Sequence, residues 1–448
     1  GGAAALAFSG DSAPPSEGRA GGPGTTARPT RPSGARTTSA PSPSGSSADG
    51  PEPVVLAGPD AVEDWSRAGK YAPNCLEASD KVIMVVGDKS TSFLEAATGK
   101  RAFDSLNTAS DTGMGLFRYP TACMDGVFYL LYDTPSPPGS LAAFDAASGK
   151  AKWAINLAAS DPGGAKLDRY YSRDYVAAAG NTVYVWGKVR ELGGKYSAED
   201  PTTGYIRAFN ATTGKRLWQV DGTDINNVLA PTSGSRLLVS SAPPGRKAHH
   251  VQMIDAGKDG ARGWKMSIPH SLFVSTGRAL ACYAAGVFLF AGGTGDTLFA
   301  VDAATGSKNW HRRFKANNGD HVRIGAPFSS LDGTTAYVPV GSDLVALATA
   351  DGAARWVARL EGGDDVGRAN MFQASLKLGD RSAQCSADTV FATDTAKTLW
   401  AIDAATGRAR WRYSDSSQPD GGFLWTVGGD RVFIASHLTM TAIAADGR

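Results

Sequence analysis

The sequence contains few of the residues on which catalysis and metal binding usually depend. Of its 448 residues only 4 are cysteine and 6 are histidine. The cysteines form no Cys-x-x-Cys pair and the histidines are scattered, so neither a zinc site nor a haem-attachment motif is indicated. The Gly-x-Ser-x-Gly nucleophile elbow and the glycine-rich phosphate loop are also absent. We therefore expect no catalytic residues and no bound metal in this part of the chain.

Net charge and long apolar runs are equally limited. The 45 basic and 43 acidic side chains leave a formal charge of +2, so nucleic acid, whose phosphates require a basic surface, is not an expected partner. The apolar stretch over residues 1–10, GGAAALAFSG, is too short to span a bilayer. We interpret it as the end of a truncated transmembrane or signal segment. This interpretation predicts an extracytoplasmic protein that is membrane-tethered or secreted, with membrane contact only upstream of residue 11.

Residues 11–53 are rich in proline, serine, glycine and threonine and contain few large apolar side chains. Such a composition buries too little apolar surface to offset the entropy lost when a chain becomes ordered. We predict a disordered linker here, followed by one folded domain over residues 54–448.

One pattern recurs through that domain, and it is clearest in Leu399–Trp411, LWAIDAATGRARW. An apolar strand is followed by a turn that ends in glycine and by a short strand with an aromatic residue four positions later. The turn glycines are Gly99, Gly149, Gly214, Gly260, Gly306, Gly352, Gly407 and Gly447. The aromatic residues are Phe103, Trp153, Trp218, Trp264, Trp310, Trp356 and Trp411. Successive glycines are 40 to 65 residues apart, which is the size of a four-stranded propeller blade.

The residue types explain why the unit is structural. Valine, leucine, isoleucine and phenylalanine favour a pleated strand, and the glycine is expected to adopt a positive φ that other residues avoid. The aspartate that ends the first strand, as in Asp145, Asp302 and Asp403, is expected to accept hydrogen bonds from the turn amides. Tryptophan is wide enough to fill the space between neighbouring sheets. The repeated residues are therefore predicted to be scaffold.

These repeats predict an all-β fold, an eight-bladed β-propeller of four-stranded blades. The last repeat stops at Arg448 before its aromatic strand, whereas Trp65 near the start belongs to no repeat. We expect the segment around Trp65 to supply the outer strand of the eighth blade and close the ring, which removes exposed sheet edges.

The four cysteines, Cys75, Cys123, Cys282 and Cys385, each lie shortly before the second strand of their blade. Buried thiols at the inner strands are one interpretation. A disulfide between Cys75 and Cys123 of neighbouring blades is the other, and the sequence leaves both open.

Polar and aromatic residues gather just before the second strands, where the innermost strands begin. If several of them converge on the central channel, they would suit an anionic or aromatic small ligand. The candidate ligand-binding residues are Arg118, Tyr119, Asp174, Tyr175, Arg278, His321, Arg323, Arg381 and Trp425. The alternative is that many of them are rim residues in ion pairs. Two insertions, Lys188–Gly204 and Glu361–Asp380, are further candidates for specificity loops.

The repeated pattern, written [LV]-x-A-[FIVL]-D-A-A-[TS]-G-[KR]-x-x-W, resembles the pyrroloquinoline-quinone (PQQ) enzyme repeat over residues 54–448. The resemblance implies a propeller that in its founding members holds the quinone and a calcium ion, beneath a ring of two adjacent linked cysteines. This sequence has no adjacent cysteines, and no segment matches the calcium ligands or the catalytic aspartate.

The chain is more similar to non-enzymatic relatives, above all the extracytoplasmic sensor regions of bacterial serine/threonine protein kinases. This similarity implies a ligand- or partner-binding sensor propeller without a cofactor, whose partner is a small molecule or an extracytoplasmic protein. A quinoprotein-type oxidoreductase with PQQ and calcium is one alternative, and a protein–protein interaction scaffold is the other.

Overall fold

The computed structural model describes residues 51–447, with gaps at 69–72, 88–90, 104–118, 133–139, 158–174, 190–202, 223–224, 232–235, 242–247, 270–280, 293–295, 316–323, 326, 361–387, 395–396, 415–422 and 437. All of these residues belong to the second of two units, which begins at Gly45. Among them, no helix has the length and apolarity needed to cross a membrane.

The described residues fold into antiparallel sheets in which consecutive strands are hydrogen-bonded neighbours. Blade one contains β3 (Pro73–Ala78), β4 (Val82–Gly87), β5 (Thr91–Glu95) and β6 (Arg101–Phe103). Blade two contains β7 (Tyr119–Met124), β8 (Val127–Tyr132), β9 (Ser140–Asp145) and β10 (Ala151–Asn156). Blade three contains β11 (Tyr175–Ala179), β12 (Thr182–Val189), β13 (Thr203–Asn210) and β14 (Arg216–Gly222). Blade four contains β15 (Ile225–Pro231), β16 (Arg236–Ser241), β17 (Ala248–Asp255), the 3-10 turn η2 (Ala256–Lys258) and β18 (Ala261–Pro269).

The remaining blades follow the same plan, with additions from the start of the domain. Blade five contains β19 (Ala281–Ala284), β20 (Val287–Gly292), β21 (Thr297–Asp302) and β22 (Lys308–Arg313). Blade six contains β23 (Phe328–Ser329), β24 (Thr335–Val340), β25 (Asp343–Ala348), β26 (Ala354–Arg359) and the added β1 (Val54–Val55). The described strands of blade seven are β27 (Thr389–Thr393), β28 (Thr398–Asp403) and β29 (Ala409–Ser414). Blade eight contains β30 (Leu424–Gly428), β31 (Arg431–Ala435), β32 (Thr439–Ala444) and β2 (Glu63–Ala68).

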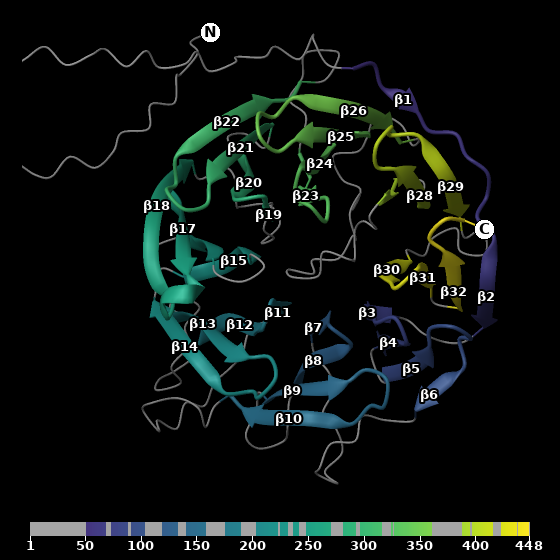
Figure 1. Cartoon of the computed structure of the whole chain (residues 1–448), viewed down its shortest axis with the longest axis horizontal. Helices are drawn as coiled ribbons and strands as arrows, with labels where there is room; N and C mark the ends of the chain where they lie inside the picture. Colours follow the sequence, from purple (N-terminus) through teal and green to yellow (C-terminus); the bar gives the residue numbers. More distant parts are fainter. Residues whose placement is uncertain are drawn as a thin grey trace, which may run out of the picture. The chain divides into compact units, whose positions relative to one another are not determined.

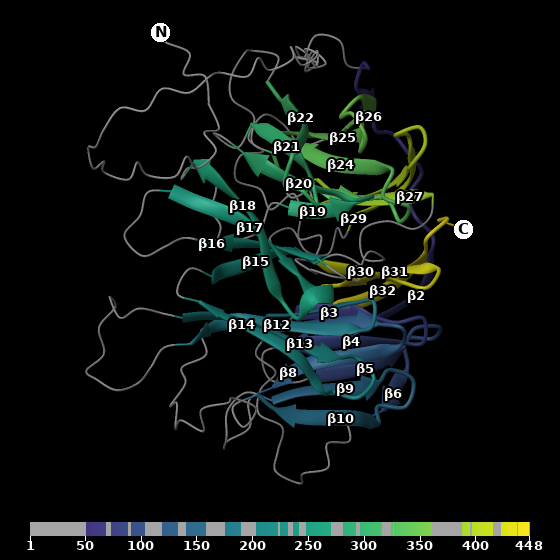
Figure 2. The same ribbon diagram turned by 60° about the vertical axis from the view of Figure 1, so that its left-hand side comes forward.

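The sheets form a ring, with first strands such as β3, β7 and β19 at its centre and last strands such as β10 and β22 at its rim (Figure 1). Figure 2 shows the blades stacked face against face. This confirms the all-β, eight-bladed propeller that the repeats predict.

The core of the ring lies between neighbouring blades. Phe93 of blade one shares a buried cluster with Phe128 and Leu130 of blade two, and each other cluster likewise joins two sheets. A single blade therefore cannot bury its own apolar faces, and the fold requires the complete ring.

Each turn glycine is contacted by the aromatic side chain of the preceding blade. The eight glycines have φ values between 65° and 79°, as their position after the turn predicts. A Cβ added at Gly407 would lie 2.7 Å from the indole of Trp356, so no side chain fits there. The indole N–H also donates to a carbonyl of the next turn, from Trp356 to Ala404 at 2.9 Å and from Trp411 to Ala445 at 3.1 Å. The predicted scaffold role of these residues thus includes a tie from each blade to the next.

The segment around Trp65 closes the ring as predicted. β2 pairs antiparallel with β32, with Trp65 opposite Ala442. The Trp65 indole donates to the Ala96 carbonyl of blade one at 3.1 Å and covers Gly99. The first and last parts of the domain therefore share one sheet.

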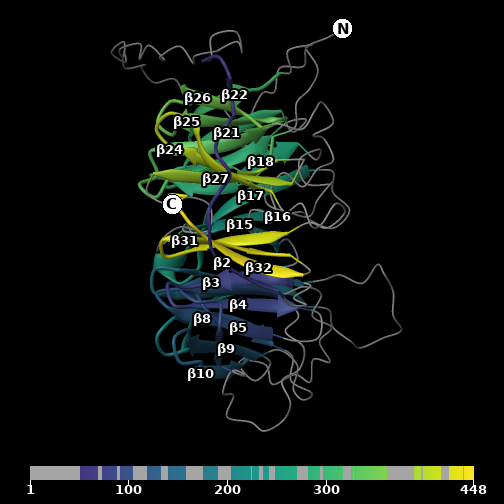
Figure 3. The ribbon, with the colours of Figure 1, turned by 90° about the vertical axis from the view of Figure 1, so that its right-hand side faces the viewer.

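The residues just before β2 make a second closure that the sequence did not reveal. We call residues 54–62 the strap; it follows the rim from blade six to blade eight (Figure 3). β1 pairs in parallel with β26, and Asp60 bridges in parallel to Arg412 of blade seven. Leu56 is only 1% exposed and packs among buried residues of blades six and seven. Two-residue parallel pairing has no periodic signature, which is why the repeat pattern does not predict it.

The cysteines lie on innermost strands, Cys75 in β3, Cys123 in β7 and Cys282 in β19. Cys123 is a buried thiol between blades one and two, and Cys282 is a partly buried thiol. The buried-thiol interpretation therefore applies to Cys123 rather than the disulfide with Cys75. Cys385 lies outside the described residues.

Candidate functional site

The strand order defines two faces of the ring. In blades one to six short turns join the first to the second strand and the third to the fourth, and β28–β29 and β30–β31 are joined in the same way. These turns lie on one face, here called the turn face. The opposite ends of the strands define the loop face. Every innermost strand that the structure describes begins at the loop face, because the strands of a meander alternate in direction.

Three of the nine predicted ligand-binding residues lie in described strands, near the loop-face ends of innermost strands. Tyr119 and Tyr175 are the first residues of β7 and β11, and Trp425 is the second residue of β30. Those outside the described residues are Arg118, Asp174, Arg278, His321, Arg323 and Arg381. Whether the set converges on one ligand remains a prediction.

Trp425 is the one member of this set whose side chain is described. It is 3% exposed, and its indole N–H donates to the Thr393 hydroxyl at 2.9 Å. Its ring lies 6.1 Å from that of Phe391, centroid to centroid. These contacts join blade eight to blade seven, so the described role of Trp425 is packing.

Two buried carboxylates at the loop face, which sequence reasoning did not single out, hold the ends of strands. Asp296 accepts from Nε of Arg313 at 2.8 Å and from the hydroxyl of Thr297 at 2.9 Å. Asp394 accepts from the indole of Trp400 and from the backbone N–H of Thr398, both at 2.8 Å. Buried carboxylates are retained only when paired in this way, and both serve structure here.

The first insertion lengthens a hairpin at the loop face. β12 and β13 remain paired out to Val189 and Thr203, so both are 8 residues long. The rest of that insertion, and the whole of Glu361–Asp380, lie outside the described residues.

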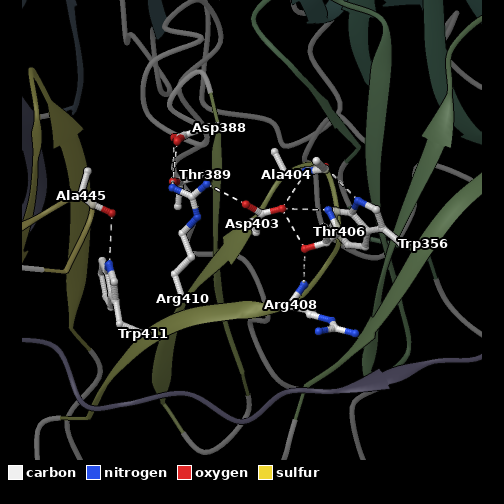
Figure 4. A network of polar contacts seen from close by, with 11 residues as sticks. Trp356, Asp388, Thr389, Asp403, Ala404, Thr406, Arg408, Arg410, Trp411 and Ala445 are labelled. Atoms are coloured by element: carbon white, nitrogen blue, oxygen red, sulfur yellow. Dashed lines mark hydrogen bonds and ion pairs between the residues drawn. The ribbon is translucent and has the colours of Figure 1, made fainter.

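The turn face carries a repeated polar network, shown for blade seven in Figure 4. Asp403 accepts from the backbone and hydroxyl of Thr406 at 2.9 and 2.8 Å, and from Arg410 at 2.7 Å. Arg410 also reaches Asp388 at 2.9 Å. In blade three Asn210 takes the same place and accepts from Thr213 in the same way. The repeated carboxylates thus shape turns, as predicted.

These hydrogen bonds lower the pKa values of the turn carboxylates. The Ser148 hydroxyl is the main cause for Asp145, and the backbone N–H and hydroxyl of Thr305 are the main causes for Asp302. For Asp403 burial opposes the shift, but Arg410 and Thr406 outweigh it. A lowered pKa means that the folded turn favours the ionised aspartate. The stability that this aspartate contributes to the folded protein is therefore complete above the ordinary pKa of 3.8, and it is lost as the pH falls through the lower pKa of the folded state.

We expect the double substitution D145N/D302N to reduce the acid sensitivity of the protein. Asparagine keeps the acceptor oxygen, as Asn210 shows, so stability at pH 7 should change little. Urea-unfolding midpoints measured between about pH 7 and pH 2.5 should fall less for the variant than for the wild type. The variant has fewer carboxyl groups whose pKa is lowered by folding, so protonation at low pH costs it less stability. Asn210→Asp is the matched reverse change and should increase the acid sensitivity. Identical pH profiles for all three proteins would contradict this.

Among the residues that the structure describes, no group of three or more histidine, cysteine, aspartate or glutamate side chains is placed to hold a metal ion.

Comparison with known proteins defines the class of the fold. The family model PQQ_2, described as outer membrane protein assembly factor BamB, matches residues 50–194, 202–364 and 247–428. Because the match covers most of the chain, the protein belongs to this family of PQQ-type repeat propellers. No curated protein matches it.

Several solved structures match the chain at low sequence identity. The computationally designed protein Ika8 matches with a TM-score of 0.51 and 13% identity, covering 84% of this chain and 98% of its own. BamB from Moraxella catarrhalis matches with a TM-score of 0.44 and 14% identity, covering 86% and 99%. The quinohemoprotein alcohol dehydrogenase ADHIIG from Pseudomonas putida HK5 matches with a TM-score of 0.48 and 12% identity, covering 88% and 78%. At this identity the match to Ika8 shows the fold alone.

Proposed function

We propose that this ring is a non-catalytic, extracytoplasmic propeller that binds a protein partner. The observation that carries the proposal is the family match from residue 50 to residue 428, because the family is described as an assembly factor. The linker composition of residues 11–53 supports a domain held at the end of a tether.

The polar contacts of the repeats support a binding scaffold in preference to an enzyme. The turn aspartates, the buried Asp296 and Asp394, and Arg410 are all engaged in contacts that hold strands and turns together. These polar residues of the blades thus serve folding. We expect binding specificity to come from the connections at the loop face, because rigid scaffolds carry their binding residues on variable loops.

The finer proposal is that the ring is the sensor domain of a membrane serine/threonine kinase. It rests on the similarity of the linker and apolar stub to those sensor regions, and a kinase domain would then precede residue 1. Reading the gene upstream for a catalytic His-Arg-Asp and an Asp-Phe-Gly motif tests this directly.

Photo-crosslinking tests the proposed protein partner. A benzoylphenylalanine at Tyr119, a strand start on the loop face, should yield a protein adduct in cells, whereas the same residue at Lys150 on the turn face should not. Thermal unfolding of the purified chain with PQQ, with and without calcium, and with sugars and sugar acids forms the second arm, because a ligand of the folded state raises the melting temperature.

The outcomes separate the alternatives. A loop-face adduct without stabilisation by small molecules supports the proposal. Stabilisation by PQQ only with calcium would replace it with an oxidoreductase. Stabilisation by a sugar acid that is lost in Arg278→Ala or Arg381→Ala would replace it with a small-molecule sensor.

A further inference from the structure

The strap is held to the rim by fewer contacts than the strand that follows it. It pairs at three positions, Val54, Val55 and Asp60, which contact two different blades. β2 pairs with β32 at five positions, and the Trp65 indole and the Asp64 carboxylate add bonds to blades one and eight. Because segments with few contacts open at low cost, the strap can leave the rim while β2 keeps the ring closed.

One buried side chain anchors the strap. Leu56 is the only buried residue of the strap, and it enters a cluster between blades six and seven that contains Trp356 and Trp400. Its N–H donates to the Arg359 carbonyl at 3.2 Å. The neighbouring Val55 is 62% exposed and adds little burial. The apolar contribution to docking therefore comes mainly from a single leucine.

Two further positions of the strap restrict which sequence fits. A Cβ added at Gly58 would lie 3.1 Å from the Cβ of Ala409, so the segment must be narrow there. Arg412 donates its backbone N–H to the Pro59 carbonyl at 2.9 Å, and its guanidinium meets Asp60 at 2.9 Å. We call the covered surface the strap site; its residues include Trp356, Ala358, Arg359, Trp400, Ala409 and Arg412.

The strap site therefore recognises an extended segment with a leucine, a glycine two residues later and an aspartate two residues after that. The ion pair adds selectivity rather than strength, because the side chains of Asp60 and Arg412 are 82% and 43% exposed and are screened by water and salt. A segment of another protein with the same side chains would make the same contacts. The strap competes with it from within the chain, since attachment gives the strap a high effective concentration.

We propose that the strap site docks a partner protein, which displaces the strap and inserts an extended segment carrying a leucine and, four residues later, an aspartate. The proposal rests on the proposed protein-binding function but concerns the rim rather than the loop face. A loop-face adduct without binding at the strap site would remove this proposal alone. Binding at the strap site without a loop-face adduct would move the partner from the loop face to the rim.

Hydrogen exchange of the full chain tests whether the strap opens by itself. The amides of Leu56 and Ala61 donate to the rim, to the carbonyls of Arg359 and Arg412. We expect them to exchange at least about 100-fold faster than the hydrogen-bonded amides of β2, because the strap opens without the ring. Equal protection of the two segments would mean that the strap is released only when the ring opens, and it would overturn the proposal.

Fluorescence anisotropy tests docking, with a labelled peptide of the strap sequence VVLAGPDAV titrated with the full chain. We expect saturable binding to the wild type with a Kd below about 1 mM. The protein variant Leu56→Ala should bind the peptide at least about tenfold more tightly, because its own strap competes less well. Val55→Ala is the matched control and should bind as the wild type does. Peptides with alanine for the leucine, or lysine for the aspartate, should bind at least about tenfold more weakly.

A locked strap shows whether the peptide occupies the strap site. Val55 and Arg359 are paired positions of β1 and β26, so Val55→Cys together with Arg359→Cys can form a disulfide across them. The oxidised variant should bind no peptide, and reduction should restore binding. The wild type with and without reductant controls for the native cysteines.

Two outcomes of the peptide titrations would also count against the docking surface. Binding to Leu56→Ala but not to the wild type at about 1 mM peptide would mean that the strap covers its site permanently and only completes the fold. Undiminished binding to the oxidised locked variant would mean that the peptide binds elsewhere on the protein.

Discussion

Replacement of Trp411 by alanine is expected to lower the free energy of unfolding by about 3–5 kcal/mol, the usual cost of removing a large buried aromatic side chain. Trp411 is 1% exposed, lies between blades seven and eight, and shares a cluster with Phe391 and Val432. Its indole N–H also ties blade seven to the Ala445 carbonyl. Equilibrium unfolding in urea measures the loss.

A second substitution separates packing from the hydrogen bond. Trp411→Phe keeps an aromatic ring and removes the indole N–H, as Phe103 does naturally where it packs on Gly149 in blade two. We expect a loss of about 1–3 kcal/mol, less than for alanine, because the hydrogen bond is lost and the smaller ring leaves part of the space between the blades unfilled. Leu217→Ala on the exposed rim, where the side chain is 47% exposed, is the control and should change stability little. A cost for Trp411→Ala no larger than that of the control would contradict the packing argument.

Removal of residues 1–68 is expected to have the largest effect on stability of any change considered. It deletes the strap and β2, so it exposes the edge of β32 and the apolar surface that Leu56 and Trp65 cover. The lost burial and the lost strand pairing together correspond to at least about 5 kcal/mol. Circular dichroism and light scattering should show a broader, earlier unfolding transition and self-association.

The control restores the missing strand as a separate molecule. A synthetic peptide covering residues 51–68 should raise the melting temperature of the shortened chain in proportion to its concentration, since it binds only the folded ring. The same peptide with Trp65→Ala should be much weaker, because Trp65 bonds to Ala96 and covers Gly99. A shortened chain as stable as the full chain would show that the ring does not depend on this closure.

Much of the fold could be predicted because the repeat is local and regular. The aspartate, the glycine and the tryptophan four residues later lie within one turn and two strands, so their spacing is visible along the chain. Trp65 was assigned to blade eight for the same reason, because the last repeat lacks its own aromatic strand. The structure confirms the closure, with Trp65 opposite Ala442.

The candidate site was less predictable. Trp425 was predicted to line the channel because it is an aromatic residue near the start of an innermost strand. Only its contacts with Phe391 and Thr393 show that it packs between blades. Asp296 and Asp394 stand in no motif, and their partners Arg313 and Trp400 come from other strands of the same blades. Such pairs depend on sheet register, which a single sequence does not display.

The sequence by itself determined the blade number, the turn chemistry and the strand that closes the ring, because each is encoded within a few neighbouring residues or by counting copies. Only the tertiary structure decided the strap and the indole ties between blades. These features join residues far apart in the chain, such as Asp60 and Arg412. Which strand edges are covered is decided by how the closed ring brings distant segments together, because edge hydrogen bonds are made by the backbone and leave no pattern of side chains to read.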